Sequence, residues 1–115
     1  MTKPLNKTLK FTPQLSELIK QGHKTTTWRL FDDKNLTVND ELTLATREGE
    51  TVTNFGRAKI LAISIRTIST LLPEDYIGHE PVSNPLLEHK KYYGNRVQLN
   101  TEVKVIKFMV IEIYK

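Results

Sequence analysis

The segment Gly22–Arg29 carries the side chains of this sequence that are best placed to do chemistry. Lys24, Thr27 and Arg29 supply an amine, a hydroxyl and a guanidinium within six consecutive positions. Such cations can hold a phosphate or a carboxylate, and a hydroxyl becomes a nucleophile when a neighbouring base removes its proton. A lysine can be that base only in its neutral form, which requires burial or a nearby cation to lower its pKa. We therefore expect the three groups to converge on one wall of a pocket.

The same segment is predicted to contain the start of a strand. Residues 25–30 are rich in β-branched and aromatic types, which favour extended backbone. Alternation then gives one face to Thr25, Thr27 and Arg29 and the other, core-facing, to Thr26, Trp28 and Leu30. Residues three apart on a strand point to opposite sides. Lys24 and Thr27 can therefore face the same pocket only if Lys24 lies in the turn before the strand.

The elements around this segment predict a small α+β domain. A helix over 13–21 is indicated by Thr12 as its cap, Pro13 at its first position and Gly22 at its end. A second helix over 85–93 begins after Asn84 and buries Leu86, Leu87 and Tyr93 in the prediction. Alternating or apolar runs predict strands over 8–11, 25–30, 41–46, 51–55, 57–68 and 102–114.

Two of these elements bear on the site. The run 57–68 is apolar on both faces in its middle, which is typical of a central, bent barrel strand. The long connection 69–83 is expected to overhang the pocket, because connections of this length in compact domains often carry function. Five or six mostly antiparallel strands with two helices is the outline of a small β-barrel.

The string Gly22-His23-Lys24-Thr25-x-Thr27-x-Arg29 resembles the glycine-x-lysine-threonine-x-threonine-x-arginine signature of the ASCH domain. This family consists of small β-barrels related to PUA domains. The residues 38–42 and the Gly56-Arg57-Ala58 opening of a long strand agree with it. The family usually has glycine where Asn39 stands, and asparagine also tolerates the left-handed conformation of a turn. The resemblance covers roughly residue 9 to the C-terminus and implies a PUA-like barrel.

The resemblance also implies roles for individual residues. In the ASCH-like bacterial enzymes that deacetylate N4-acetylcytidine, the signature lysine accepts a proton, the threonine is the nucleophile and a later glutamate donates a proton. Lys24 and Thr27 occupy the first two positions. Glu80 is our choice for the third, with Glu74 in reserve and Glu88 less suitable by spacing. The substrate-contacting residues are then expected to be Arg29, Thr25, His79, Glu74 and Tyr93.

Three function classes stay open at this point. The first is a hydrolase of an acylated nucleoside, the second a non-catalytic RNA-binding module in which Lys24 and Arg29 contact phosphates. The third is a ribonuclease that uses the same cleft on single-stranded RNA. Purely structural roles would also account for these residues. Threonines favour strands, Trp28 favours a core, and Lys24 and Arg29 can bind a phosphate or a structural carboxylate. The expected partner is a nucleoside or RNA, with the chain a monomer or weak homodimer.

Composition limits the remaining possibilities. The 115 residues suit one domain over 1–115, with residues 1–7 loosely ordered. No cysteine is present, which excludes disulfides and thiolate chemistry. The three histidines lack metal-ligand spacing, so no metal or other cofactor is expected. No apolar run has the length of a signal peptide or membrane span, and we expect a cytoplasmic protein. The formal charge of +4 is compatible with a nucleotide or nucleic acid partner.

Overall fold

The computed structural model describes residues 7–31 and 34–114, which form five strands, two α-helices and three short 3-10 turns. The predicted α+β class is confirmed. The two helices follow their predicted bounds closely, and the strands match except that the two predicted strands after residue 50 are one. In chain order the elements are β1 (Lys7–Phe11), α1 (Pro13–Lys20), β2 (Thr26–Leu30), β3 (Glu41–Glu48), β4 (Thr51–Thr67), η1 (Ile68–Thr70), η2 (Pro73–Tyr76), α2 (Pro85–Tyr93), η3 (Gly94–Arg96) and β5 (Glu102–Ile113).

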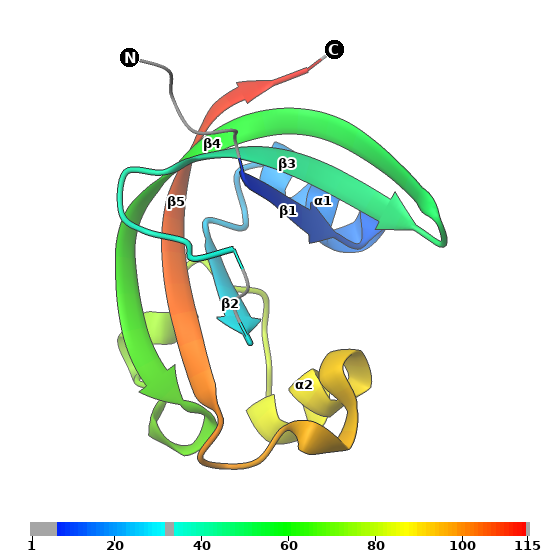
Figure 1. Ribbon diagram of the computed structural model, residues 1–115. Helices are drawn as coiled ribbons and strands as arrows, with labels where there is room; N and C mark the ends of the chain where they lie inside the picture. Colours follow the sequence, from blue (N-terminus) through cyan, green and yellow to red (C-terminus); the bar gives the residue numbers. More distant parts are fainter. Residues whose placement is uncertain (1–6, 32–33, 115) are drawn as a thin grey trace.

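The strands form a single curled sheet in the order β1-β3-β4-β5-β2. β1 pairs with β3 in parallel, and the other neighbours are antiparallel. The predicted small, mostly antiparallel barrel-like fold is confirmed; within the described ranges no ladder joins β1 to β2, so the sheet is curled into a half-barrel with two edges. Figure 1 shows why it curls: β4 arches over the molecule, with its first part, residues 51–59, paired with β3 and its residues 56–67 paired with β5.

The bend in β4 has a local cause. Its register with β5 shifts at Arg57/Ala58 and again between Ile60 and Ala62. Such bulges insert an extra residue into one strand, which increases the twist and bends the strand. The predicted bend of this strand is therefore confirmed, and it sets the half-barrel's curvature.

Helix α1 closes one side of the sheet. Its N-cap Thr12 accepts a hydrogen bond from the Leu15 amide at 3.3 Å, and the chain leaves it through Gly22 at φ +80°. Ile19 is buried against the sheet. The resulting α1 core is entirely apolar; its members are Leu9, Phe11, Ile19, Leu36, Leu42, Leu44, Phe55, Ala58, Ile60, Ile106 and Phe108.

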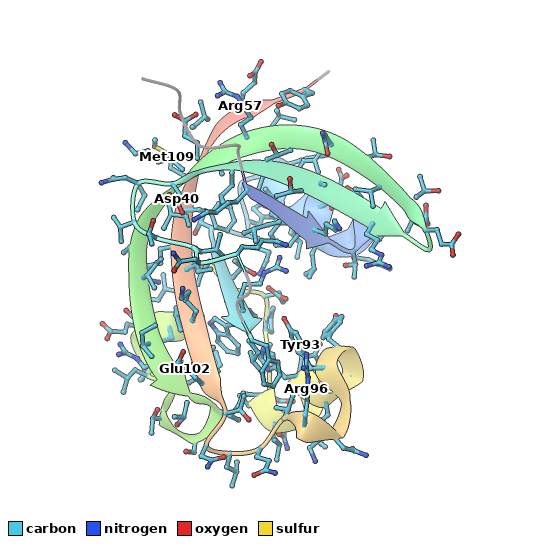
Figure 2. The ribbon with its side chains drawn as sticks, in the orientation of Figure 1. Asp40, Arg57, Tyr93, Arg96, Glu102 and Met109 are labelled. Carbon is cyan, nitrogen blue, oxygen red and sulfur yellow. The ribbon has the colours of Figure 1, made fainter. Side chains whose placement is uncertain are left out.

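A second cluster, the α2 core, lies where the connection 68–84 and helix α2 meet β2 and β5. Its buried members are Trp28, Leu30, Ile68, Val97, Val103 and Val105. Leu86 and Tyr93 of α2 pack against it. Figure 2 shows Tyr93 and Arg96 at this end of the molecule, away from Arg57 and Met109.

Two local predictions were wrong. Lys7, expected in a loose N-terminal segment, begins β1 and its Nζ lies 2.7 Å from Asp40 Oδ2, because pairing with β3 orders it; residues 1–6 lie outside the described residues. Leu87, expected in the buried face of α2, is 59% exposed, whereas His89 is 6% exposed. The His89 ring faces inward, where it stacks against Trp28 and its Nδ1 lies near the Pro85 carbonyl; a leucine side chain could not make the second contact. Asn39 does adopt the predicted left-handed turn conformation, at φ +75°.

Candidate functional site

The signature segment delivers Lys24 in the position that the chemistry requires. After α1 the amides of His23 and Lys24 both donate to the Leu18 carbonyl, at 2.9 and 3.2 Å. This holds the chain in a turn, and β2 begins only at Thr26. Lys24 is therefore outside the strand's alternation, and both Lys24 and Thr27 line the same pocket. The geometric condition set by the sequence is met.

Lys24 is one of the most deeply buried side chains of the described residues, at 1% exposure. Its Nζ donates to the Thr26 carbonyl at 2.8 Å and contacts Glu80 Oε1 in a short ion pair. Burial lowers the pKa of Lys24, which the attraction of Glu80 opposes only in part and the neighbouring Arg29 charge assists. The proton on this amine is thus held more weakly than on an exposed lysine.

Glu80 is held beside Lys24 by the connection that carries it. Burial raises the pKa of this carboxyl, but the Lys24 ammonium lowers it by more, so its pKa lies below the ordinary value. At neutral pH Lys24 is therefore protonated and Glu80 ionised, and the two groups form an ion pair. Moving that proton across the contact would give a neutral amine and a carboxylic acid together.

Gly78 fixes residues 77–80 of the long connection onto the signature segment, Gly22–Arg29. Its carbonyl accepts the amides of Thr25 and Thr26 at 2.8 and 3.0 Å, and Thr26 Oγ1 donates to the Ile77 carbonyl at 2.7 Å. Gly78 has φ +80°, and a Cβ there would lie 2.2 Å from Thr25 Oγ1. Only glycine meets both conditions. The close approach is what brings Glu80 to Lys24.

Lys107 of β5 braces the same connection from its other side. Its Nζ donates to the Glu74 carbonyl at 3.1 Å and to the Ile77 carbonyl at 3.4 Å. Two lysines thus hold the connection, but only Lys24 is paired with a carboxylate and turned into the pocket.

A stack of aromatic rings packs the connection and α2 against β2 on one side of the pocket. The Trp28 ring is stacked on His79, with centroids 3.9 Å apart and planes 20° apart, and on His89 at 5.8 Å. Trp28 Nε1 donates to the Asp75 carbonyl at 3.0 Å. Trp28 is therefore both a core residue, as predicted, and the platform on which the connection and α2 rest.

His79 couples this stack to Glu80. Its Nδ1 lies 2.8 Å from the Glu80 carbonyl, to which it donates. Burial lowers the pKa of His79 to about 4, with the positive charge of Lys24 adding to the effect. His79 is consequently neutral at physiological pH, and its Nε2 has a free lone pair.

Arg29 crosses the opening that the half-barrel leaves between its two edges. Its Nη2 donates to the Lys10 carbonyl of β1 at 3.0 Å, and its guanidinium lies over the Phe11 ring at 4.7 Å from the centroid. The side chain thereby joins β2 to β1 without a backbone ladder. This bridge forms part of the pocket wall.

The pocket itself has a volume of about 520 Å³ and is bounded by β1, the end of β3, β2, the connection and α2. In Figure 1 these are the elements that surround the space between α2 and the β1–β3 layer. Its wall combines aromatic side chains with many charged and hydroxyl-bearing ones, so it is more polar than the usual small-molecule site. A volume of this size suits a ligand no larger than a nucleotide.

The structure brings together six of the eight residues predicted for the site, which are Lys24, Thr27, Arg29, His79, Glu80 and Tyr93. The other two lie elsewhere. Thr25 contacts Gly78 and lines a separate cavity on the far side of Lys24. Glu74 has a 64% exposed side chain and pairs with Arg66 at 3.2 Å. Glu80, and not Glu74, is the carboxylate beside Lys24, while the roles of all these residues stay predictions.

Sequence reasoning missed four contributors. Gly78 gave a signal as a glycine inside the long connection, but nothing indicated its contact with Thr25. His89 was not assigned to either face of α2, and it lines the pocket. Lys10 and Arg47, at the pocket's outer rim, come from strands that approach β2 only in the folded chain.

No group of histidine, aspartate or glutamate side chains suited to a metal ion occurs in the part of the chain that the structure describes. Over the same residues, no helix has the length and apolar character needed to cross a bilayer.

Solved structures share this architecture at low sequence identity. A DUF984 protein from Enterococcus faecalis superposes with a TM-score of 0.77 over all of this chain and 86% of its own, at 14% identity. The ASCH domain of Lactobacillus crispatus matches 90% of this chain and 79% of its own, with a TM-score of 0.60 and 11% identity. ASCH from Zymomonas mobilis covers 94% and 71%, with a TM-score of 0.66 and 13% identity. The chain therefore has the predicted ASCH-domain fold. No family model matches it, and neither does any curated protein.

Proposed function

We propose that this protein is an amidohydrolase that removes the acyl group from an N4-acylated cytidine, with Lys24, Thr27 and Glu80 as its working residues. The observation that carries the proposal is the buried Lys24–Glu80 pair, which lies in the wall of the same pocket as Thr27. A buried amine with a lowered pKa beside a carboxylate is costly to maintain for stability alone. Groups perturbed in this way are concentrated at functional sites.

The proposed reaction begins with the proton that the pair shares. When substrate excludes water from the pocket, the proton moves from Lys24 Nζ to Glu80, because a low dielectric favours the neutral pair. Lys24 then removes the proton of the Thr27 hydroxyl as Oγ1 attacks the acyl carbonyl. Glu80 returns its proton to the cytosine nitrogen as the carbon–nitrogen bond breaks. The amine leaves and the acyl group stays on Thr27 as an ester.

Water completes the cycle. It attacks the ester carbonyl, the Thr27 oxygen is reprotonated, and the acyl group leaves as a carboxylic acid. The Thr27 hydroxyl is available for this role, since it makes no hydrogen bond within residues 7–31 and 34–114. Lys24 must turn from the Thr26 carbonyl towards Thr27, which is a side-chain movement of the kind that substrate binding commonly produces.

The test measures release of cytidine from N4-acetylcytidine by the wild type and by Lys24→Met, Thr27→Val and Glu80→Gln. Each variant keeps the shape of the side chain and removes its proton chemistry. We expect each to lower kcat/KM by at least about 100-fold. Lys59→Met and Thr43→Val, the same changes outside the pocket, serve as controls and should retain wild-type rates. Melting temperatures show whether each variant is folded.

A wild type that releases no cytidine overturns the proposal, and so does full activity in folded Lys24→Met. The RNA-binding alternative would then be favoured by oligonucleotide binding that weakens steeply with salt, because each neutralised phosphate releases counterions. Cleavage of that oligonucleotide would favour the ribonuclease alternative.

A further inference from the structure

The outer rim of the pocket differs from its inner end in charge. At the inner end Lys24 is neutralised by Glu80. At the rim, Lys10 of β1 and Arg47 of β3 are exposed and line the pocket. Within the described ranges neither side chain forms an ion pair. Among the described residues, the rim therefore presents two cations that no carboxylate neutralises.

The sheet places these two cations next to each other. Lys10 is paired with Ala45 in the parallel β1–β3 ladder, and Arg47 is two residues further along β3. Strand spacing then puts their Cα atoms about 8 Å apart. Two long side chains that start at this separation can close on one tetrahedral anion.

The rim is also firmly held. The Arg29 Nη2 hydrogen bond to the Lys10 carbonyl fixes β1 at this point, and Arg47 Nε donates to the Gly49 carbonyl at 3.2 Å at the hairpin. The second of these bonds leaves the outer nitrogens of the Arg47 guanidinium for a ligand. Cations on a held scaffold need little reorganisation when they bind.

Acidic groups near the rim do not cancel this charge. Glu88 of α2 lines the pocket but pairs with Lys91 at 3.3 Å. Lys34 also lines the pocket, but two aspartates precede it in the sequence, so the proposed subsite does not include its charge. The unneutralised charge is that of Lys10 and Arg47.

We propose that Lys10 and Arg47 form a phosphate subsite, so that the ligand of this pocket is a cytidine 5′-phosphate rather than the neutral nucleoside. This rests on the proposed function for the identity of the base and its acyl group. The order of the residues along the pocket wall supports the proposal. Thr27 lies at the inner end, and Arg29 follows it on the same face of β2. Lys10 and Arg47 are outermost. A ligand with a reacting base and an anionic end matches that order.

The experiment has a binding arm that does not depend on turnover. Calorimetry compares cytidine 5′-monophosphate with cytidine at fixed salt, using the wild type, Lys10→Ala/Arg47→Ala and the matched control Lys59→Ala. We expect the wild type and the control to bind the monophosphate at least about tenfold more tightly, as two exposed charge-assisted contacts allow. The double variant should bind both ligands equally.

A kinetic arm separates the two proposals. It compares N4-acetylcytidine with its 5′-phosphate. If both are deacetylated at equal kcat/KM, giving cytidine and cytidine 5′-monophosphate respectively, and the binding arm shows no preference, the subsite is overturned while the proposed function stands. If neither is hydrolysed but the monophosphate is preferred in binding through Lys10 and Arg47, the subsite stands and the proposed function fails.

RNA as the natural ligand is a separate outcome. A single-stranded oligonucleotide that binds more than about 100-fold more tightly than the monophosphate, with a salt dependence indicating several phosphate contacts, would overturn the mononucleotide subsite. Inorganic phosphate, added as a competitor, should weaken monophosphate binding in the wild type and leave cytidine binding unchanged.

Discussion

The two cores of this molecule differ in what they bury. The α1 core, between α1 and the sheet, adjoins a single buried polar side chain of α1, the hydroxyl of Ser16, which accepts a hydrogen bond from Thr46. The α2 core adjoins Asp75 and His89, which are buried, and the rings of His79, His89 and Tyr76 contact its Trp28. Titratable groups are therefore enclosed where the connection and α2 close over β2. The α1 side therefore supplies stability, whereas the α2 side encloses polar groups around the pocket at a cost in stability.

The largest effect on stability is expected in the α1 core. Leu44 is fully buried there at 0% exposure, and Leu44→Ala leaves a cavity as well as losing apolar burial. We expect a loss of about 3 to 5 kcal/mol in the free energy of unfolding, measured by urea denaturation. A loss below about 1 kcal/mol would contradict the assignment of the main stabilising core to this side.

The α2 side should make stability depend on pH. Burial and the charge of Lys24 lower the pKa of His79 to about 4, whereas in the unfolded chain its pKa is near the ordinary value of 6.5. Between these values the unfolded state binds more protons. The stabilisation that His79 contributes to the free energy of unfolding is therefore fully present above pH 6.5. It decreases as the pH drops, and the loss levels off below about pH 4.

We expect a loss of about 2 to 3 kcal/mol across that interval from this group. The measurement is urea unfolding at a series of pH values for the wild type and His79→Gln, with the exposed His23→Gln as control. The His79→Gln curve should be flatter than the other two. Three parallel curves would show that His79 is not the source of the dependence.

The contact between the connection and the signature segment can be tested with two glycines of the same conformation. Gly22 and Gly78 both have φ +80°, but a Cβ at Gly22 meets nothing within 4 Å, whereas one at Gly78 lies 2.2 Å from Thr25 Oγ1. Gly22→Ala should cost about 1 kcal/mol, the price of left-handed backbone. Gly78→Ala should cost about 2 kcal/mol or more.

The same pair separates stability from function. Gly78→Ala should also lower the proposed hydrolase activity, because it moves Glu80 away from Lys24, and Gly22→Ala should affect it less. Equal effects of the two substitutions on both readouts would show that the close approach of Gly78 to Thr25 does not position the site.

The smallest effect is expected on the outer face of α2. Leu87 is 59% exposed, so Leu87→Ala should change the free energy of unfolding by less than about 0.5 kcal/mol. His89→Ala on the buried face should cost more, since its Nδ1 is 2.8 Å from the Pro85 carbonyl and its ring stacks against Trp28. Urea denaturation of both variants checks the orientation of the helix, and a reversed order would contradict it.

Local sequence signals determined most of the secondary structure. Thr12, Pro13 and Gly22 set the bounds of α1, Asn84 and Pro85 set the start of α2, and alternation located the strands. These signals are short-range, because caps, turn residues and side-chain period act over a few positions. The signature also gave three of the pocket's residues, Lys24, Thr27 and Arg29, since they lie within one turn and one strand.

The tertiary structure decided the rest. That Glu80 rather than Glu74 meets Lys24 depends on Gly78 docking onto Thr25 and Thr26, a contact across more than fifty residues. The open edges of the sheet and the approach of Lys10 and Arg47 to the pocket depend on how β4 bends, and the inward turn of His89 depends on its packing against Trp28. Sequence patterns describe which face of an element is apolar, but the partner of a buried polar group is chosen by the packing of distant elements, where burial makes each unpaired group costly.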